Sequence, residues 1–286
     1  TIRCRAWKQN HRTIAIAGKP TGSGTASQTL FVPIVLDVGG VGGARFGSEL
    51  TLANRGTSTA TVSMTYTGSY LLGGGAGSGT VTETLAPGRQ LILPDALAYL
   101  RSKGRPIPSD GSSQGGTLRV RFDGLSSEDA GYAVVRTTTP SGNGRAGLSY
   151  PGLTPSQLLT GDSVIVGLRE DFGDRSNLAL ANAGTSGTIS LKVYIVKGDG
   201  SAAVYIDPDY VLGPEQGTQI GRVLDLAGYA DGWILVEQTA GTEPYTAYAV
   251  FNDNATNDGS YVPAVPVETV DAFGTVPVLV ETSVYR

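Results

Sequence analysis

Hydrophobic and polar residues alternate along most of the chain with a period of two. Leu50 and Leu52 are separated by a threonine, and Val62, Met64 and Tyr66 are separated by a serine and a threonine. This is the pattern of a β-strand with one buried face. Long stretches with the 3.6-residue period of an amphipathic helix are absent from the sequence. The pattern therefore predicts an all-β protein. Twelve of the alternating apolar residues are expected in its core: Leu50, Leu52, Val62, Met64, Leu118, Val120, Leu178, Leu180, Ile189, Leu191, Ile234 and Val236.

One nine-residue stretch occurs twice. Residues 50–58 read LTLANRGTS and residues 178–186 read LALANAGTS, 128 positions further on. Two later strands also match between the halves, 117–121 with 233–237 and 132–136 with 248–252, both at an offset of 116, and the segment 149–151 matches 261–263. Matches that keep one order along the chain indicate homologous modules in tandem.

Within each copy we expect a β-hairpin. The strand over 50–54 is followed by the turn residues Asn-x-Gly-Thr-Ser, in which Gly56 and Gly184 can adopt positive φ. The chain then returns through a second alternating strand over 61–66. A two-stranded hairpin is not stable alone, so each module must contribute further strands.

The remaining elements favour an open sandwich. Each module has seven or so short strands with turn signals between them, which is typical of an Ig-like β-sandwich, with an up-and-down barrel as the main alternative. Pro33, inside the apolar strand 30–36, predicts an edge strand or one that switches between sheets. A short helix is expected over 94–100, between Pro94 and Gly104, and 223–229 is interpreted as its shortened counterpart.

These signals divide the chain into five segments. We predict a basic N-terminal tail and linker over 1–28, the first β-sandwich over 29–151, a linker over 152–162, the second β-sandwich over 163–266 and a C-terminal strand extension over 267–286. The predicted fold is thus all-β, with two tandem Ig-like sandwiches and one short helix inserted in the first.

The charge distribution excludes some classes of partner. The chain of 286 residues has a net charge of −4, which gives no reason to expect nucleic-acid binding. Residues 1–36 contain five basic residues and no acidic ones, so they carry +5 and the rest carries −9. No stretch approaches the roughly 20 apolar residues of a membrane span. Cys4 is the single cysteine, so it can form a disulfide only with another chain.

Candidate catalytic groups are sparse. His11 is the sole histidine and lies with Cys4 in the N-terminal tail, outside both predicted sandwiches. A nucleophile needs a neighbouring base, and zinc needs four ligands, so neither site is expected. We therefore predict that the protein is not an enzyme and needs no cofactor.

Two groups of carboxylates are weak candidates for binding calcium. They are Asp171 and Asp174 before the second repeated stretch, and Asp253 and Asp258 in a later loop. The simpler interpretation is that these side chains form Asx turns with their own backbone. The N-glycosylation sequon at 254–256 is likewise interpreted as part of a turn. Arg119 and Arg121 project from one strand face, which we interpret as solvated rather than as a basic binding patch.

The order of the motifs also resembles a known family. The succession VPIV, LTLANRGTSTATVSM, LAPG, LILPDALAYL and GGTLRV, with YAVFNDNATNDGSYVPA in the second module, is similar to a β-sandwich repeat of secreted bacterial surface proteins. The resemblance covers about residues 29–266. It implies an extracellular or cell-surface location and a non-catalytic role, and it transfers no functional residue.

The C-terminal segment suggests how copies of the chain join. Residues 275–282 (TVPVLVET) repeat the pattern of residues 31–38 (FVPIVLDV), so the chain ends with what resembles the first strand of another module. The predicted interface residues are Val276, Pro277, Val278, Leu279 and Val280 on the donated strand and Phe31, Val32 and Ile34 at the first-strand position. This predicts a filament or surface-layer subunit that joins copies of itself head to tail by β-strand addition.

Three alternatives remain open at this stage. The terminal strand can fold back onto its own second module, or the chain can be part of a longer repeat protein. The protein can instead be an extracellular module that binds glycans or other ligands through the long loops of the first sandwich. A solvent-lined pocket with an aromatic platform would favour this last function.

Overall fold

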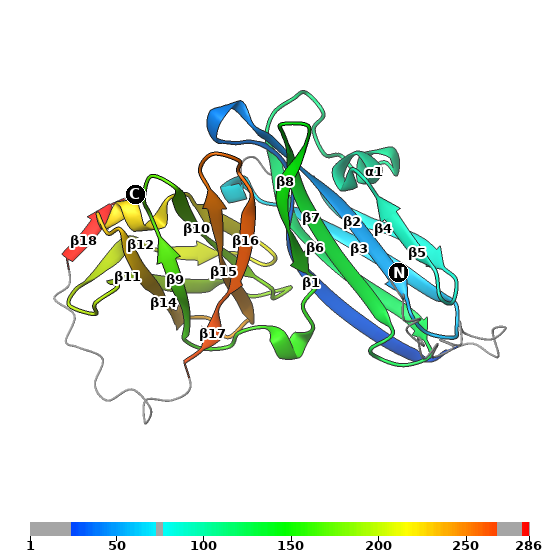
Figure 1. Ribbon diagram of the computed structural model, residues 1–286. Helices are drawn as coiled ribbons and strands as arrows, with labels where there is room; N and C mark the ends of the chain where they lie inside the picture. The colour runs from blue at the N-terminus through cyan, green and yellow to red at the C-terminus, as the bar shows by residue number, and fades with distance from the viewer. Residues whose placement is uncertain (1–23, 73–76, 268–281, 286) are drawn as a thin grey trace, which may run out of the picture.

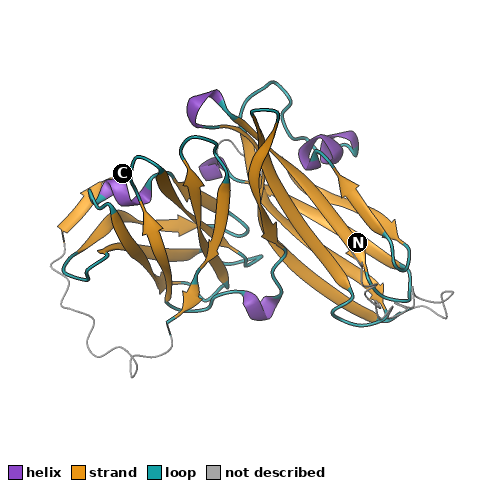
Figure 2. Cartoon of the chain, viewed as in Figure 1, coloured by secondary structure: helices purple, strands orange, loops and turns teal. Residues whose placement is uncertain are grey.

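The computed structural model describes residues 24–72, 77–267 and 282–285 (Figure 1). These residues form mainly antiparallel sheets arranged in two sandwiches side by side, with a single α-helix and four short 3₁₀ turns among them (Figures 1 and 2). The predicted fold class, an all-β sandwich with one short helix, is confirmed.

The first sandwich contains eight strands. They are β1 (Ala26–Gly39), β2 (Arg45–Asn54), β3 (Ala60–Gly68), β4 (Ser78–Leu85), β5 (Gln90–Leu93), β6 (Gln114–Leu125), β7 (Gly131–Ser141) and β8 (Gly144–Pro151). One layer has the order β4-β3-β6-β1 and the other has β5, β7 and β1 around β2, with β8 beside β7. Strand β1 belongs to both layers and joins them at one side. Among the described strands β4 does not pair with β5 or β8 at the other side, so no barrel closes.

The second sandwich repeats this order. Its strands are β9 (Ser163–Arg169), β10 (Asp174–Asn182), β11 (Ile189–Lys197), β12 (Ala203–Leu212), β13 (Gly217–Ile220), β14 (Asp231–Ala240), β15 (Tyr245–Asp253) and β16 (Gly259–Pro263). The layers β12-β11-β14-β9 and β13-β10-β15-β16 correspond strand by strand to those of the first sandwich. Two short strands extend the first of these layers, β17 (Val265–Pro266) beside β9 and β18 (Thr282–Tyr285) beside β12.

Strand β1 is a switching strand and not an edge. It pairs with β6 from Ala26 to Asp37, and its last three residues, Asp37 to Gly39, pair with β2. The register of the β1–β6 pair shifts between Val32 and Val35, which is where Pro33 lies. A proline donates no backbone hydrogen bond, so it is tolerated where the ladder is interrupted.

The expected hairpins are wrong. Strands β2 and β3 belong to different layers, and so do β10 and β11. In each pair the intervening turn crosses from one layer to the other. The alternation of the two strands is the same in both arrangements, because each strand turns one hydrophobic face toward a shared core. The pattern alone therefore does not distinguish a hairpin from a crossover.

A buried asparagine holds each crossover. The Asn54 side-chain nitrogen donates to the carbonyls of Ser58 and Leu85, at 2.7 and 2.9 Å, and its oxygen accepts from the Gly56 amide. Asn182 makes the same set of bonds in the second sandwich, to Gly187, Leu212 and Gly184. The repeated Asn-x-Gly thus ties three segments together.

One of the sequence offsets also needs correction. The pairing with β2 and β10 places Val134 and Tyr248 at the same position, because they lie opposite Thr51 and Ala179 respectively. The offset between β7 and β15 is therefore 114, two less than the 116 read from the sequence. A shift of two leaves every side chain on the same face of its strand, so the expected cores are unaffected.

Two hydrophobic cores lie between the layers. The twelve residues expected there from the period-two pattern are all buried: Leu50, Leu52, Val62, Met64, Leu118, Val120, Leu178, Leu180, Ile189, Leu191, Ile234 and Val236. Helix α1 (Ala96–Ser102) adds Leu97 and Leu100 to the first core, and Asp95 caps it by accepting from the Ala98 amide at 2.8 Å. In the second sandwich a 3₁₀ turn, η4 (Val223–Leu226), takes the place of α1 and is also buried in part.

The segment between the sandwiches is bonded to both of them. Leu153 forms a two-way backbone bridge with Phe31 on β1, and Leu159 forms another with Tyr245 on β15. A short 3₁₀ turn, η3 (Pro155–Gln157), lies between these bridges. The linker is therefore part of the junction between the two sandwiches.

Candidate functional site

The junction between the sandwiches combines a buried apolar surface with several polar contacts. The second sandwich contributes the outer face of its β13-β10-β15-β16 layer, which we call the docking face and define by Ala179, Ala181, Tyr248 and Val250. These four side chains are 1–4% exposed. Three of them, Ala179, Tyr248 and Val250, pack in the core cluster of the first sandwich.

The first sandwich contributes the outer face of β1 and β6, which we call the receiving face and define by Phe31, Thr117, Arg119 and Leu153. Phe31 is 1% exposed although it points out of its own sandwich, because Ala181 and Ala183 pack on it. The Arg119 guanidinium lies 5.8 Å from the centre of the Phe31 ring. The receiving face thus places an aromatic ring under a charged group.

Glu215 connects the two faces through polar contacts. Its carboxylate accepts from the Arg119 Nε at 2.6 Å and from the Thr67 hydroxyl at 2.7 Å, and its backbone carbonyl accepts from the Thr117 hydroxyl at 2.8 Å. The Arg119 and Glu215 side chains are only 22% and 13% exposed. Glu215 adopts a φ of +56°, a left-handed conformation that costs a non-glycine residue about 1 kcal/mol.

A second polar contact lies at Ser69. Its hydroxyl donates to the Gly217 carbonyl at 2.6 Å, and the neighbouring Gln216 side chain donates to the Gly68 carbonyl at 3.1 Å. Ser69 is fully buried. Together with the Glu215 contacts, these bonds fix the register of one sandwich on the other.

Three tyrosines close the junction beside β8 and β16. The ring of Tyr248 lies 5.4 Å from that of Tyr150 and 5.2 Å from that of Tyr261, measured between centroids. Burial raises the pKa of all three hydroxyls, and that of Tyr261 to about 12. The neutral phenol is therefore strongly favoured in the folded junction.

A cleft of about 370 Å³ also opens between the sandwiches. Its walls include Leu36, Phe46 and Leu148, and Arg175 and Arg222 lie at its polar end. Arg175 is 4% exposed and donates to the side-chain oxygens of Asn254 and Asn257. Burial lowers the pKa of Arg175, and the nearby Arg222 guanidinium lowers it further.

Glu170 neutralises part of this positive charge. It contacts the Arg222 Nη1 at 2.5 Å and is nearly buried. Burial raises the pKa of the Glu170 carboxyl, while hydrogen bonds from the Ser176 amide and from Arg222 act in the opposite direction. The cluster is a buried polar network that links the loops before β10 and after β15.

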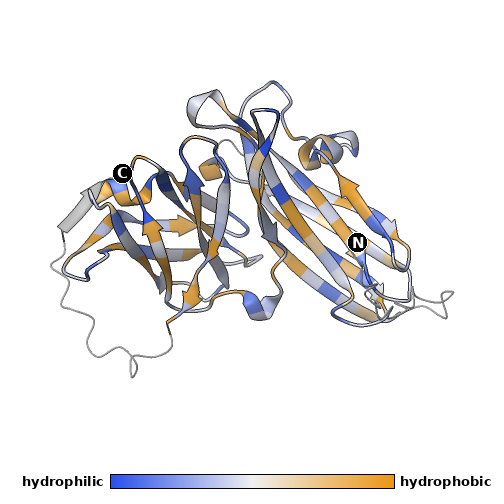
Figure 3. Cartoon of the chain, viewed as in Figure 1, coloured by the Kyte–Doolittle hydropathy of each residue, from blue (hydrophilic) through white to orange (hydrophobic). Residues whose placement is uncertain are grey.

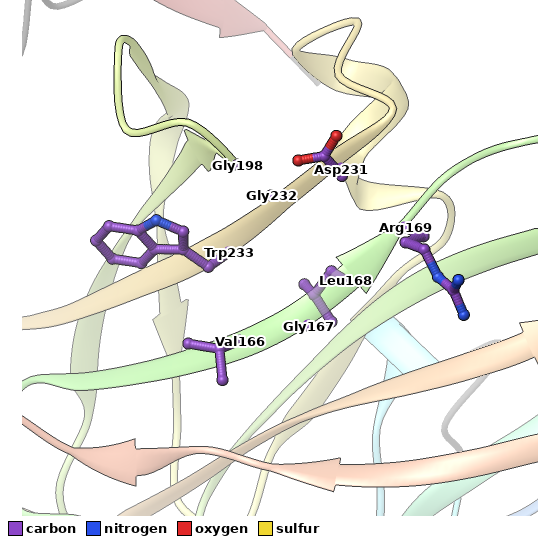
Figure 4. Close-up of a pocket in the computed structure, with 8 residues that line it drawn as sticks. All are labelled: Val166, Gly167, Leu168, Arg169, Gly198, Asp231, Gly232 and Trp233. Atoms are coloured by element: carbon purple, nitrogen blue, oxygen red, sulfur yellow. The ribbon is translucent and has the colours of Figure 1, made fainter.

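A shallow groove of about 450 Å³ lies on the outer surface of the second sandwich (Figure 4). It is lined by Trp233 on β14 and by Val166 and Gly167 on β9, with Asp231 at one end. The β9–β14 register shifts here, which leaves Val166 and Gly167 as a bulge opposite Trp233, and Val166 is 59% exposed. Bulges of this kind often lie next to functional surfaces.

The predicted interface residues are placed only in part. Phe31, Val32 and Ile34 lie on β1 and are at most 1% exposed, so the first-strand position of this sandwich is filled by the chain's own strand. The donated residues, Val276 to Val280, lie outside the described residues. Residues 282–285, which follow them, pair in parallel with β12 of the same chain.

The calcium candidates are engaged by their own loops. Asp171 accepts from the amides of Gly173 and Asp174, and Asp253 accepts from the amides of Ala255 and Thr256. These are Asx turns, the simpler of the two interpretations. In the part of the chain that the structure describes, no group of three His, Cys, Asp or Glu residues is placed to hold a metal ion. Asp174 pairs with Arg169, and Asp258 accepts from the Gly147 amide.

The interpretation of Arg119 as solvated is wrong. Its side chain is covered by the second sandwich, while that of Arg121, two residues further on, is exposed and pairs with Asp123. Alternation places both arginines on one face and carries no information on what packs against that face. Glu215 has no signal of its own in the sequence, since it follows Gly-Pro in an ordinary turn.

His11 and Cys4 lie outside the described residues, as does the rest of the basic tail up to residue 23. Among the residues described, no helix has both the length and the apolar composition needed to cross a membrane. The chain matches no protein-family model, and no curated protein is significantly similar to it.

Proposed function

We propose that the protein is an exported, non-catalytic structural subunit that joins copies of itself head to tail into an extracellular filament or surface layer. The main support for this proposal is the junction between the two sandwiches of the chain. One sandwich binds the next through a buried apolar face fixed by Glu215, Arg119 and Ser69. A module that already contains the two complementary faces of a heterologous contact is suited to forming an open series.

The second line of support is that a sheet edge takes up an additional strand. The β12 edge pairs with β18 over four residues, Val204 to Asp207. Backbone pairing at a free edge is the mechanism of β-strand addition. Because the first-strand positions are filled by β1 and β9, and β12 pairs with β18 of the same chain, a strand donated by another copy would pair at another edge, such as β4.

The experiment for strand addition is a deletion of residues 273–286. Light scattering of the intact and truncated chains over a range of concentrations compares their assembly. We expect the intact chain to form species larger than a monomer, and the truncated chain to form fewer or none. Equal assembly by the two chains would show that the C-terminal strand is not a connector.

A second candidate function is binding of glycans, and the groove at Trp233 favours it. The partly buried indole of Trp233 beside Val166 offers a flat apolar surface for a sugar ring, and the Asp231 carboxylate can accept hydrogen bonds from hydroxyls. Isothermal titration with soluble polysaccharides tests this function. Binding that is lost in Trp233→Ala and kept in Phe172→Ala, a fully exposed aromatic residue elsewhere, would support it.

A further inference from the structure

Both faces of the internal junction have a counterpart that is not covered by the other sandwich. The docking face of the second sandwich corresponds, through the strand register, to Thr51, Ala53, Val134 and Arg136 of the first. The receiving face of the first sandwich corresponds to Val164, Trp233, Leu235 and Val265 of the second. We call these two surfaces the free docking face and the free receiving face.

The free docking face exposes large hydrophobic side chains. Ile92 and Tyr132, which flank Thr51 and Ala53 on β5 and β7, are 47% and 44% exposed. Of their counterparts by register on the second sandwich, Thr246 is 3% exposed, whereas Gln219 lies at the cleft between the sandwiches and is exposed. The same layer is thus covered in one sandwich and open in the other. Figure 3 shows hydrophobic positions along β5, at the end of the molecule remote from the second sandwich.

The free receiving face is also apolar. In place of Phe31, Thr117 and Arg119 it has Val164, Trp233 and Leu235, in the same positions relative to β9 and β14. Val265 takes the place of Leu153 and is 51% exposed, whereas Leu153 is 8% exposed. In Figure 1 this layer, β11, β14 and β12, lies on the side of the second sandwich away from the first.

The two charged partners of the internal junction, Glu215 and Arg119, are both replaced by uncharged residues on the free faces. Glu215 corresponds to Gly88, because the residues that follow them are bonded in the same way. The backbone amide of Asn182 donates to the Gln216 carbonyl, and that of Asn54 donates to the Arg89 carbonyl, both at 2.9 Å. Arg119, the partner of Glu215, corresponds to Leu235. A contact between the free faces would therefore place a glycine turn against leucine and tryptophan, with no unpaired carboxylate or guanidinium at the positions of Glu215 and Arg119. The one charged residue among those that define the two free faces is Arg136, which takes the position of Val250, a residue that lines the cleft between the sandwiches.

We propose that the free docking face of one copy binds the free receiving face of a second copy, in the arrangement that the internal junction already shows. The inference rests on the proposed function and names its interface. Each added copy leaves one face of each kind uncovered, so the contact is heterologous and continues into a helical series. In that series every sandwich is related to the next by the same step, within and between copies.

The test uses two full-length variants, each with one face blocked. Ile92→Glu with Tyr132→Glu blocks the free docking face, and Leu235→Glu with Val265→Glu blocks the free receiving face. Phe172→Glu is the control, because this side chain is fully exposed and lies on neither face. Sedimentation velocity measures the size of each protein alone and of the two blocked variants mixed in equal amounts.

We expect wild type and Phe172→Glu to form a concentration-dependent series of oligomers, and each blocked variant to remain monomeric. Their mixture should form dimers and nothing larger, because each variant retains one intact face. Dimer formation also shows that both variants are folded. A mixture that stays monomeric, or blocked variants that assemble like wild type, would overturn the inference.

The outcomes separate this inference from the proposed function. Wild type that stays monomeric at every concentration contradicts the proposed function itself. Wild type that assembles together with blocked variants that assemble equally well contradicts only the interface. If assembly is unchanged while Leu235→Glu with Val265→Glu abolishes polysaccharide binding, the face binds glycans and the inference is wrong.

Discussion

At the scale of single residues, Glu215 carries much of the specificity of the junction. It holds three hydrogen-bond donors of the first sandwich while its own backbone stays in the left-handed region, with a φ of +56°. Strain at a residue that binds several partners persists because the surrounding contacts outweigh it. The glycine at the corresponding position of the first sandwich, Gly88, has a φ of +66° without such strain.

Two replacements of Glu215 separate the stabilisation by its hydrogen bonds from the cost of its left-handed backbone. Glu215→Ala should destabilise the protein by about 1–3 kcal/mol, because it removes the acceptor of the Arg119 Nε and of the Thr67 hydroxyl at a mostly buried site. Glu215→Gly should be about 1 kcal/mol more stable than Glu215→Ala, since glycine adopts the left-handed conformation freely. Urea denaturation of both variants measures the difference. Two variants as stable as wild type would show that the Glu215 contacts contribute little.

The junction tyrosines predict sensitivity to alkaline pH. Burial raises the pKa of Tyr261 to about 12, above the value near 10 of an unfolded chain. A raised pKa means that the neutral hydroxyl is favoured by folding, so this stability is fully present below about pH 10 and is lost as the pH rises towards 12. Tyr261→Phe should therefore lose less stability than wild type over this range.

Thermal unfolding measured at a series of pH values, together with tyrosinate absorbance, checks this. Tyr70→Phe serves as the control, since the Tyr70 ring is 77% exposed on the surface. If Tyr70→Phe and Tyr261→Phe show the same dependence on pH, the junction does not restrain the ionisation of Tyr261.

At the scale of elements, the crossovers between layers define the two sandwiches. Asn54 and Asn182 stand between consecutive strands of different layers and satisfy carbonyls that would otherwise be buried without a donor. Asn182→Ala should destabilise the protein by about 2 kcal/mol or more, because two carbonyls and the Gly184 amide lose their partner.

Hydrogen exchange followed residue by residue locates this loss. Asn182→Ala should lower the protection of β10 and β11, and Asn54→Ala that of β2 and β3, with a smaller effect on the other sandwich. Equal loss of protection in both sandwiches would show that the junction makes the molecule a single cooperative unit. Each asparagine thus serves as the matched control for the other.

At the scale of the whole molecule, the prediction concerns the form of the assembly. If the contact between copies repeats the internal junction, electron microscopy of the assembled protein should show a single-file series of equally spaced sandwiches, two for each copy. The power spectrum of such a filament should contain a repeat at the spacing of one sandwich. Paired or branched strands of sandwiches would contradict a contact of this kind.

The sequence was sufficient for the parts of the fold that local patterning controls. The period of two placed the twelve core residues correctly, and the turn and capping residues placed helix α1 within two residues of its observed limits. The repeated motif identified two matching halves with the same strand order. These features depend on which face of a strand is apolar and on which residues permit a turn, and both are properties of neighbouring residues.

Only the tertiary structure decided which strands pair and what covers their outer faces. The same alternation fits a hairpin or a crossover, so the sequence did not place β2 and β3 in different layers. Arg119 and Arg121 look alike in the sequence, yet one is held by Glu215 and the other is exposed, because a contact between residues 96 positions apart depends on how two finished sandwiches meet. The faces that join modules are therefore visible only after both modules are folded.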